Sequence, residues 1–479
     1  MLFWEWERLS SWSEKNLITI TNPGKLLHPI KKFKIWRDEK LQIFIETVST
    51  SLPEFDKNNF EAGTIHENNE FIEFDGPNEI TARANGVTLL STSTTYTDDR
   101  RITTQLSSIH SLEHSSNKAD KVSLVFDWIA NIDAHSYLWP GFTKDAVQKV
   151  SKRQYGRKNP LELISHSDRQ EFGSRSLEIT ACGHPIVIGC TRNEKIDEKL
   201  KPGYILYRGN PDDSTRKIIR DALSFVLGFP IIHIGHAKFC ENNRKIELLA
   251  KQAYSMEGRA FNVHALPPAP ICLNIERMPE PPIVEKMVNA YCNNYDELNL
   301  KSFNWNYWHA ATAPAHMAPA YFGALIESMQ ENYKAKKGED FNTKITSKIN
   351  YKKIKKIILN ATKEVDLPAD ELDMLLDKLN HGNQISLKTK SERFFKALEL
   401  NLGELEKSAW QRRNDAAHGN QLRDGDHISL VRDIKLLKLV LHRILLKRAN
   451  ICDHYIDYYS LGFPTRELAN PVDVTSTDK

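Results

Sequence analysis

The segment PPAPICLNIERMPEPP, residues 267–282, divides the chain into two parts of different character. Six of its residues are proline, and each proline removes a backbone N–H donor that a regular helix or sheet needs. We therefore expect a linker here. It separates a predicted β-rich domain over 1–266 from a predicted helical domain over 283–465, which a polar tail over 466–479 follows. The predicted fold class is α+β.

Upstream of the linker, the pattern of apolar residues is typical of strands. Apolar and polar residues alternate from Leu41 to Ile45, which predicts a half-buried strand. Asn85-Gly86 lies between two further alternating stretches and predicts a tight hairpin, because Asn-Gly tolerates positive φ angles. Ser214 and Gly228 can cap a helix between them. Two more strands are expected, at 122–129 and 178–190.

Downstream of the linker, apolar residues recur at helical spacing. The most regular pattern joins Leu430, Ile434, Leu437 and Leu441, and its apolar surface is wide enough to need a neighbouring helix or a second subunit. Helices are predicted near 283–297, 315–336, 345–362, 369–380, 387–401, 404–418 and 427–449.

Composition excludes several classes of protein. With 40% hydrophobic and 27% charged residues in 479, the chain is expected to fold rather than to be disordered, collagen-like or a coiled coil. The net charge of +3 provides no general attraction for a polyanion. The longest apolar stretch, about 222–235, is too short to span a bilayer. No export signal is recognisable, and the six cysteines form no C-x-x-C pair, so we expect a cytoplasmic protein.

Motifs for cofactor and metal chemistry are missing from the sequence. There is no phosphate-binding P-loop and no G-x-S-x-G nucleophile elbow. His233, His236 and Cys240 could be zinc ligands, but a closed structural site needs four ligands and no fourth has a recognisable spacing. We therefore predict no metal and no cofactor, with these residues serving as ordinary strand and turn residues.

The segment Arg413-Asn414-Asp-Ala-Ala-His418-Gly419 combines a permanent cation, an amide and an imidazole. RNA cleavage without a metal needs a base for the 2′-OH, an acid for the leaving oxygen and a cation for the charge on the phosphorane. Histidine can serve as acid or base, and the arginine fork suits phosphate oxygens. The spacing alone is weak, because Arg259 and His264 repeat it in a stretch without helical pattern.

The geometry of an α-helix limits how Arg413 and His418 of one protomer can act together. Five residues rotate two side chains by about 140° around an ideal helix, so one protomer presents Arg413 and His418 poorly to a single phosphate. A two-fold interface would bring two Arg413/His418 sets together, with one histidine as base and the other as acid. The motif therefore favours a homodimer with a composite active site.

These residues resemble a known family. Arg413-Asn414 followed by His418, in a helical bundle that ends in a long apolar helix, resembles the R-N-x(3–5)-H signature of HEPN ribonucleases. A β-rich half before such a domain is similar to ApeA-like anti-phage abortive-infection proteins. The resemblance implies His418 as acid/base, Arg413 as the phosphate-binding cation and Asn414 as an orienting residue. It also implies metal-free cleavage of RNA, tRNA among the candidate targets, to 2′,3′-cyclic phosphate ends.

The resemblance implies further roles as well. Glu327, in the presumed first bundle helix, is a candidate acidic group that supports the site residues from behind. The N-terminal half would restrain the nuclease and release it on sensing a phage protein.

Basic residues outside the motif are candidates for RNA binding. Residues 344–356 hold six lysines and no acid, and Lys348, Lys352 and Lys355 with Arg412 could attract phosphates without reading bases. A solvated helix face explains the lysines equally well.

The competing class for the whole chain is not an enzyme. The motif could simply end a surface helix in a dimeric helical adaptor, whose β-rich half binds a protein or a glycan.

Overall fold

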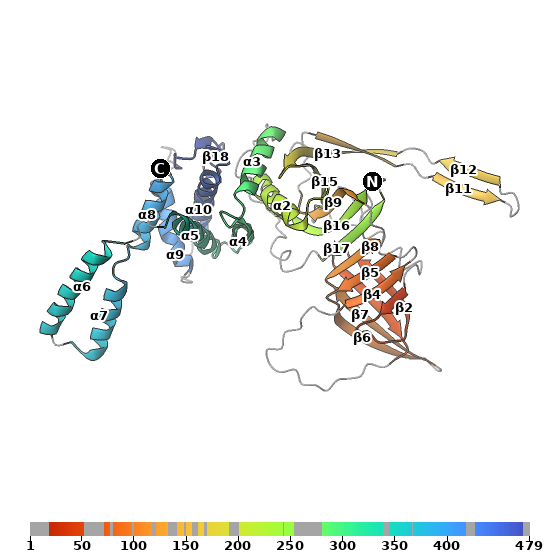
Figure 1. Cartoon of the computed structure of the whole chain (residues 1–479), viewed down its shortest axis with the longest axis horizontal. Coiled ribbons are helices and arrows are strands. Elements are labelled where there is room, and N and C mark those ends of the chain that lie inside the picture. The colour runs from red at the N-terminus through yellow and green to blue at the C-terminus, as the bar shows by residue number, and fades with distance from the viewer. Residues whose placement is uncertain are drawn as a thin grey trace. The chain divides into compact units, whose positions relative to one another are not determined.

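The computed structural model divides into two compact units, unit 1 over Met1–Tyr295 and unit 2 over Asp296–Lys479 (Figure 1). The residues described are 19–51, 71–76, 80–97, 100–116, 121–132, 141–147, 150–155, 161–166, 170–190, 201–242, 244–252, 280–338, 344–365, 367–417 and 427–472. Strands dominate unit 1 and helices dominate unit 2. The predicted α+β class, with a β-rich N-terminal region before a helical region, is therefore confirmed.

Unit 1 contains one large sheet and one four-stranded sheet. The large sheet has the order β1 (Thr19–Asn22), β4 (Phe71–Gly76), β5 (Ile80–Asn85), β8 (Ser111–Ser116), β17 (Lys245–Lys251), β16 (Ile232–Cys240), β9 (Val122–Ala130), β15 (Gly203–Arg208), β14 (His184–Cys190), β13 (Gln170–Ala181) and β10 (Gly141–Val147). The small sheet has the order β2 (Ile30–Arg37), β3 (Ile43–Ser49), β7 (Arg100–Ile109) and β6 (Thr88–Thr97). β11 (Val150–Tyr155) and β12 (Leu161–His166) form a separate ribbon.

The small sheet packs on one end of the large sheet as a sandwich. Ile43 and Ile45 of β3 are fully buried against Ile72 and Phe74 of β4 and Leu112 of β8. Alternate residues of β3 face this core, as the apolar alternation in the sequence predicts. Burial of such side chains contributes about 1.5–3 kcal/mol each.

The hairpin predicted at Asn85-Gly86 is wrong, although strands flank it on both sides. β5 pairs with β4 and β8 in the large sheet, whereas β6 pairs with β7 in the small sheet. Gly86 has the positive φ, 63°, that the dipeptide favours. The turn therefore carries the chain from one sheet of the sandwich to the other, because the pairing partners lie elsewhere in the sequence.

Helix α2 (Asp213–Leu227) covers the other end of the large sheet (Figure 1). Its N-cap is Asp212, whose side chain accepts from the Thr215 N–H, and not Ser214 as predicted. Gly228 ends the helix in the left-handed conformation with φ of 80°, as predicted. Ile219, Ala222 and Leu223, on the inner face of α2, are fully buried.

The domain boundary differs from the predicted one. Helix α3 (Pro281–Asn293), which we assigned to the helical domain, is grouped with unit 1. Glu285 and Asn289 accept backbone N–H groups from the β13–β14 hairpin, and the Tyr295 hydroxyl donates to Asp221 of α2. These contacts attach α3 to the sheet, so unit 2 begins at Asp296. Most of the predicted linker lies outside the described residues.

Unit 2 is a helical bundle with a small two-stranded sheet. Its elements are α4 (Leu300–Thr312), α5 (Ala318–Lys337), α6 (Lys348–Ala361), the 3-10 helix η4 (Thr362–Glu364), α7 (Ala369–His381), α8 (Leu387–Ala397), α9 (Glu404–Ala417), α10 (His427–Arg448), β18 (His454–Ile456) and β19 (Thr465–Glu467). Leu437, Leu441 and Ile444 of α10 are fully buried, as their spacing predicts. Among the described helices, none combines the length and apolar character needed to cross a membrane.

The segment after α10 is not a loose tail from 466 onward. Val472 is buried, and Arg443 of α10 donates to the carbonyl oxygens of Leu468 and Asn401. The Val472 N–H in turn donates to Glu406 of α9. The chain is therefore fastened to the bundle as far as Val472, and the remaining predicted tail lies outside the described residues.

Candidate functional site

Arg413, the predicted phosphate-binding residue, lies where α9 meets α5. Its side chain is only 8% exposed. The guanidinium stacks 3.4 Å from the ring centre of Trp410, one helical turn earlier. It donates to the Trp410 carbonyl oxygen and to Glu327 Oε1, both at 2.5 Å. The cation is thus held in one orientation by a ring, a carbonyl and a carboxylate.

Gly323 of α5 provides the room for this arrangement. A Cβ atom at this position would lie 2.6 Å from Arg413 Cδ, closer than side chains tolerate. The stem of Arg413 therefore crosses α5 directly over a residue that has no side chain. Neither Gly323 nor Trp410 was singled out by the sequence, because their roles depend on a helix pair that sequence spacing does not define.

Glu327 lies beside Arg413, although no motif marks it. Its side chain is 44% exposed, so one face of the ion pair is open to solvent. Within the described part of unit 2, the bonds to Trp410 and Glu327 use two of the five guanidinium N–H groups.

The structure places the remaining predicted residues differently. Arg412 forms a bidentate ion pair with Asp433 of α10, at 2.8 and 2.5 Å, and so ties two helices together. Lys348, Lys352 and Lys355 lie on α6, and Lys355 donates to Asn380 of α7. The backbone of Asn414 belongs to α9, whose last residue is Ala417. The Asn414 side chain and the whole of His418 and Gly419 lie outside the described residues.

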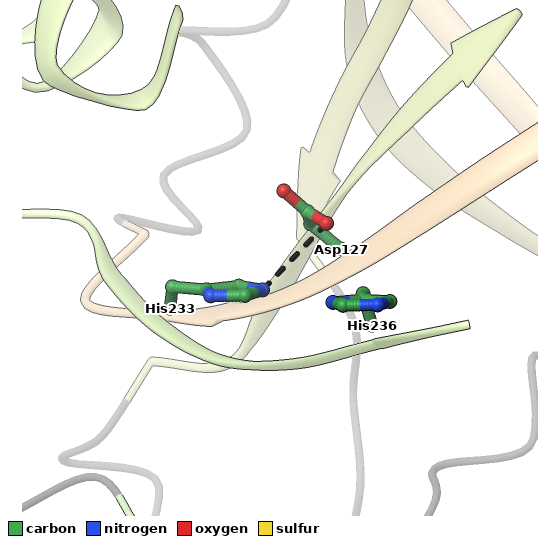
Figure 2. Close-up of side chains that lie close together, drawn as sticks. All are labelled: Asp127, His233 and His236. Carbon is green, nitrogen blue, oxygen red and sulfur yellow. Dashed lines mark ion pairs between the residues drawn. The ribbon is translucent and has the colours of Figure 1, made fainter. Parts of the chain in front are cut away.

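A second polar cluster lies in unit 1. Asp127 of β9 and His233 and His236 of β16 bring possible metal-ligand atoms within 4.8 Å of one another (Figure 2). Residues three apart on a regular strand face opposite sides. Here the β9–β16 register shifts between His233 and Gly235, which returns both imidazoles to one face, with rings 5.9 Å apart and nearly parallel.

Two arginines of α2 form ion pairs with the carboxylate at the centre of this cluster. Arg216 and Arg220 both form ion pairs with the fully buried Asp127, and the Tyr207 hydroxyl donates to it at 3.1 Å. Burial alone would raise the pKa of Asp127, but the charge of Arg220 and contacts with His233 and Arg216 hold that pKa well below its usual range. The carboxylate is therefore ionised and saturated with donors.

The guanidinium groups argue against a metal centre here. Arg216 Nη2 lies 3.5 Å from His236 Nδ1, so a dication between the imidazoles would lie beside a fixed positive charge. Two unit charges 4 Å apart repel by about 4 kcal/mol near a protein surface, and a dication doubles the cost. We therefore interpret the cluster as a buried ion-pair network that fixes α2 on the sheet.

The network predicts that unit 1 loses stability in acid. Burial, with a contribution from Arg220, lowers the pKa of His233 to about 3, whereas the unfolded imidazole titrates near 6.5. The unfolded state therefore takes up a proton first. The stabilisation is complete above about pH 6.5 and is lost as the pH falls towards 3, by about 1.4 kcal/mol per pH unit.

Urea unfolding between about pH 7.5 and 5 measures this loss. His233→Gln should reduce the dependence of the unfolding free energy on pH, because one titrating group is gone, while His236 and His442, whose pKa values are also lowered by burial, keep part of the slope. A variant that keeps the wild-type slope would contradict the assignment of the slope to His233.

Comparisons of the chain with protein-family models, curated proteins and solved structures found no match.

Proposed function

We propose that this chain is a metal-independent HEPN endoribonuclease that acts as a homodimer in anti-phage abortive-infection defence. One observation carries the proposal. Arg413 of the Arg-Asn-x-x-x-His motif lies in bundle helix α9, and its guanidinium is held in one orientation by the Trp410 ring, the Trp410 carbonyl and Glu327. A preorganised cation of this kind is what charge stabilisation on a phosphorane requires.

The proposed reaction uses only side-chain groups. His418 of one protomer takes the proton of the ribose 2′-OH, whose oxygen attacks the adjacent phosphorus. Arg413 stabilises the charge that grows on the non-bridging oxygens. His418 of the second protomer gives its proton to the leaving 5′ oxygen, so the products are a 2′,3′-cyclic phosphate and a 5′-hydroxyl. Asn414 orients the groups around the phosphate.

Glu327 acts as a positioning residue in this scheme. Its ion pair with Arg413 at 2.5 Å fixes the direction of the guanidinium fork in the absence of RNA. A bound phosphate then shares the same cation from the solvent side, where Glu327 itself is partly exposed. The acidic neighbour also limits non-productive binding of other anions.

Restraint of the nuclease is the role we propose for unit 1. The chain joins a β-rich unit with two cores to a helical unit that carries the motif. Recognition of a phage protein by unit 1 would release the activity of unit 2. The cytoplasm is the proposed location, since both the RNA and such a trigger occur there.

One observation favours the non-catalytic adaptor instead. Arg413 is largely buried and paired with Glu327, as a purely structural arginine joining α9 to α5 would be. Cleavage of RNA in EDTA by the purified full chain separates the two functions. Cleavage that His418→Ala abolishes supports the enzyme, and RNA left intact by an otherwise folded, triggered wild type supports the adaptor.

Gly323→Ala should lower RNA cleavage by about 10- to 100-fold, because a small misplacement of a catalytic cation has effects of this order. Alanine favours helix by about 1 kcal/mol over glycine, so α5 itself would not be weakened. The contact of 2.6 Å with Arg413 Cδ instead forces the guanidinium aside.

Single-turnover cleavage rates provide the measurement, and circular dichroism checks the helical content. Ser328→Ala, at an exposed position of the same helix, is the matched control and should cleave normally. Equal rates in the two variants would show that the position of Arg413 is irrelevant.

A further inference from the structure

The hairpin of α6 and α7 forms a projecting element that we call the arm, residues 344–384 (Figure 1). Lys344 pairs with Gln384 at its base, and the Tyr351 hydroxyl donates to the Leu379 carbonyl at 2.7 Å. Residues early in α6 thus meet residues late in α7, so the two helices are antiparallel. The turn between them, around η4, is the tip of the arm.

The arm exposes an unusual amount of apolar surface. No residue of α6 or α7 is buried, where the structure describes them. Ile349, Ile357 and Met374 are 69%, 67% and 60% exposed. Two helices of 14 and 13 residues are marginal in water unless an apolar face is covered. The arm therefore lacks part of its packing in a single copy of the chain.

Basic and acidic residues are concentrated in different halves of the arm. Residues 344–356, at the base, contain six lysines and no acidic residue. Residues 364–377, at the tip and along α7, contain six acidic residues and no lysine or arginine. The base half of the arm is thus mainly positive and the tip half mainly negative, with Lys363 at the turn and Asp377 beside the lysines of α6 as the exceptions.

We propose that the arm is a self-association surface whose partner is the arm of a second copy of this chain, a contact separate from the one that would pair two Arg413/His418 sets. Two arms packed antiparallel about a two-fold axis place each acidic tip against the basic base of the other. Both contacts are satisfied at once, because a two-fold interface repeats every contact. The exposed Ile349, Ile357 and Met374 then pack between the arms and lose their contact with water.

RNA fits the arm less well than a second copy does. The lysines alone would attract phosphates, but the six acidic residues at the other end would repel them. Isoleucines exposed between the lysines, such as Ile349 and Ile354, offer nothing to a phosphate backbone. Opposite charges in the two halves of one element instead match an identical element in the opposite direction.

Zero-length crosslinking of lysine to carboxylate tests the contact directly. Full-length His418→Ala protein, used so that toxicity does not interfere, is prepared in ¹⁴N and ¹⁵N forms, mixed without RNA and coupled with a carbodiimide. Mass spectrometry should find crosslinks between 344–356 of one isotope and 364–377 of the other. Crosslinks confined to one isotope would overturn the proposal.

A charge swap adds the controls. Lys352→Glu/Lys356→Glu and Asp373→Lys/Asp377→Lys should each reduce the mixed-isotope crosslinks at least fivefold, and mixing the two variants should restore them. Lys388→Glu/Lys396→Glu, the same change at exposed positions of α8, should have no effect. If the base variant loses RNA binding but keeps its crosslinks, the arm guides RNA and the dimer contact is wrong. Neither outcome depends on whether the chain cleaves RNA.

Discussion

His418→Ala and Arg413→Ala are each expected to lower RNA cleavage by about 10²–10⁴-fold, the range typical of a lost general acid or base. His418 moves protons in both halves of the proposed reaction, and Arg413 carries the phosphorane charge. Far-UV circular dichroism should stay unchanged for His418→Ala. The rate of cleavage of a labelled RNA in EDTA, by the full-length chain, is the measurement.

The matched controls come from the sequence itself. Arg259 and His264 have the same spacing as Arg413 and His418. Arg259→Ala and His264→Ala should cleave at the wild-type rate if position and not spacing matters. Full activity in both motif variants would reject the ribonuclease assignment, as would equal losses in the control pair.

Arg443→Leu is expected to destabilise unit 2 by about 3–5 kcal/mol, because it leaves a buried carboxylate without its partner. Arg443 Nη1 donates to both oxygens of Glu406, at 2.7 and 2.9 Å, and both side chains are almost fully buried. Arg443 also donates to the backbone carbonyls of Asn401 and Leu468. One residue therefore fastens α9, α10 and the following segment.

Urea unfolding of the full chain measures this loss. Lys447, also in α10, forms an exposed ion pair with Glu399, which follows α8. Lys447→Leu removes this pair and should leave the unfolding midpoint almost unchanged. The double variant Glu406→Leu/Arg443→Leu should lose less stability than Arg443→Leu alone, since no charge is left stranded. A single variant no less stable than Lys447→Leu would show that the buried pair contributes nothing.

Local patterns in the sequence predicted most of the elements but not their partners. Period-two alternation identified β3, and helical spacing identified α10, because one face of each lies against a core. Asn85-Gly86 identified a turn correctly, yet not which strands pair, since pairing depends on residues far along the chain. Helix α4 was missed, although its buried Leu300, Phe303, Tyr307 and Ala310 recur at helical spacing.

The site residues also differ in whether neighbouring sequence or contacts between distant segments identify them. Arg413, Asn414 and His418 stand in one short motif, so local sequence was enough to propose them together. Gly323 could not, because its importance depends on a crossing with α9. Asp127 had a signal that was overlooked: a single acid within the apolar strand Val122–Ala130, matched by arginines one turn apart in α2. A charge in such a strand needs a buried partner.

The chemical identity of the cut ends shows whether the ribose 2′-OH is the attacking group. RNA incubated with the full-length chain in EDTA should carry 2′,3′-cyclic phosphate and 5′-hydroxyl ends, which only attack by the ribose 2′-OH produces. These ends should disappear in His418→Ala. Ends with 3′-hydroxyl and 5′-phosphate groups, or cyclic ends that persist in His418→Ala, would contradict the account.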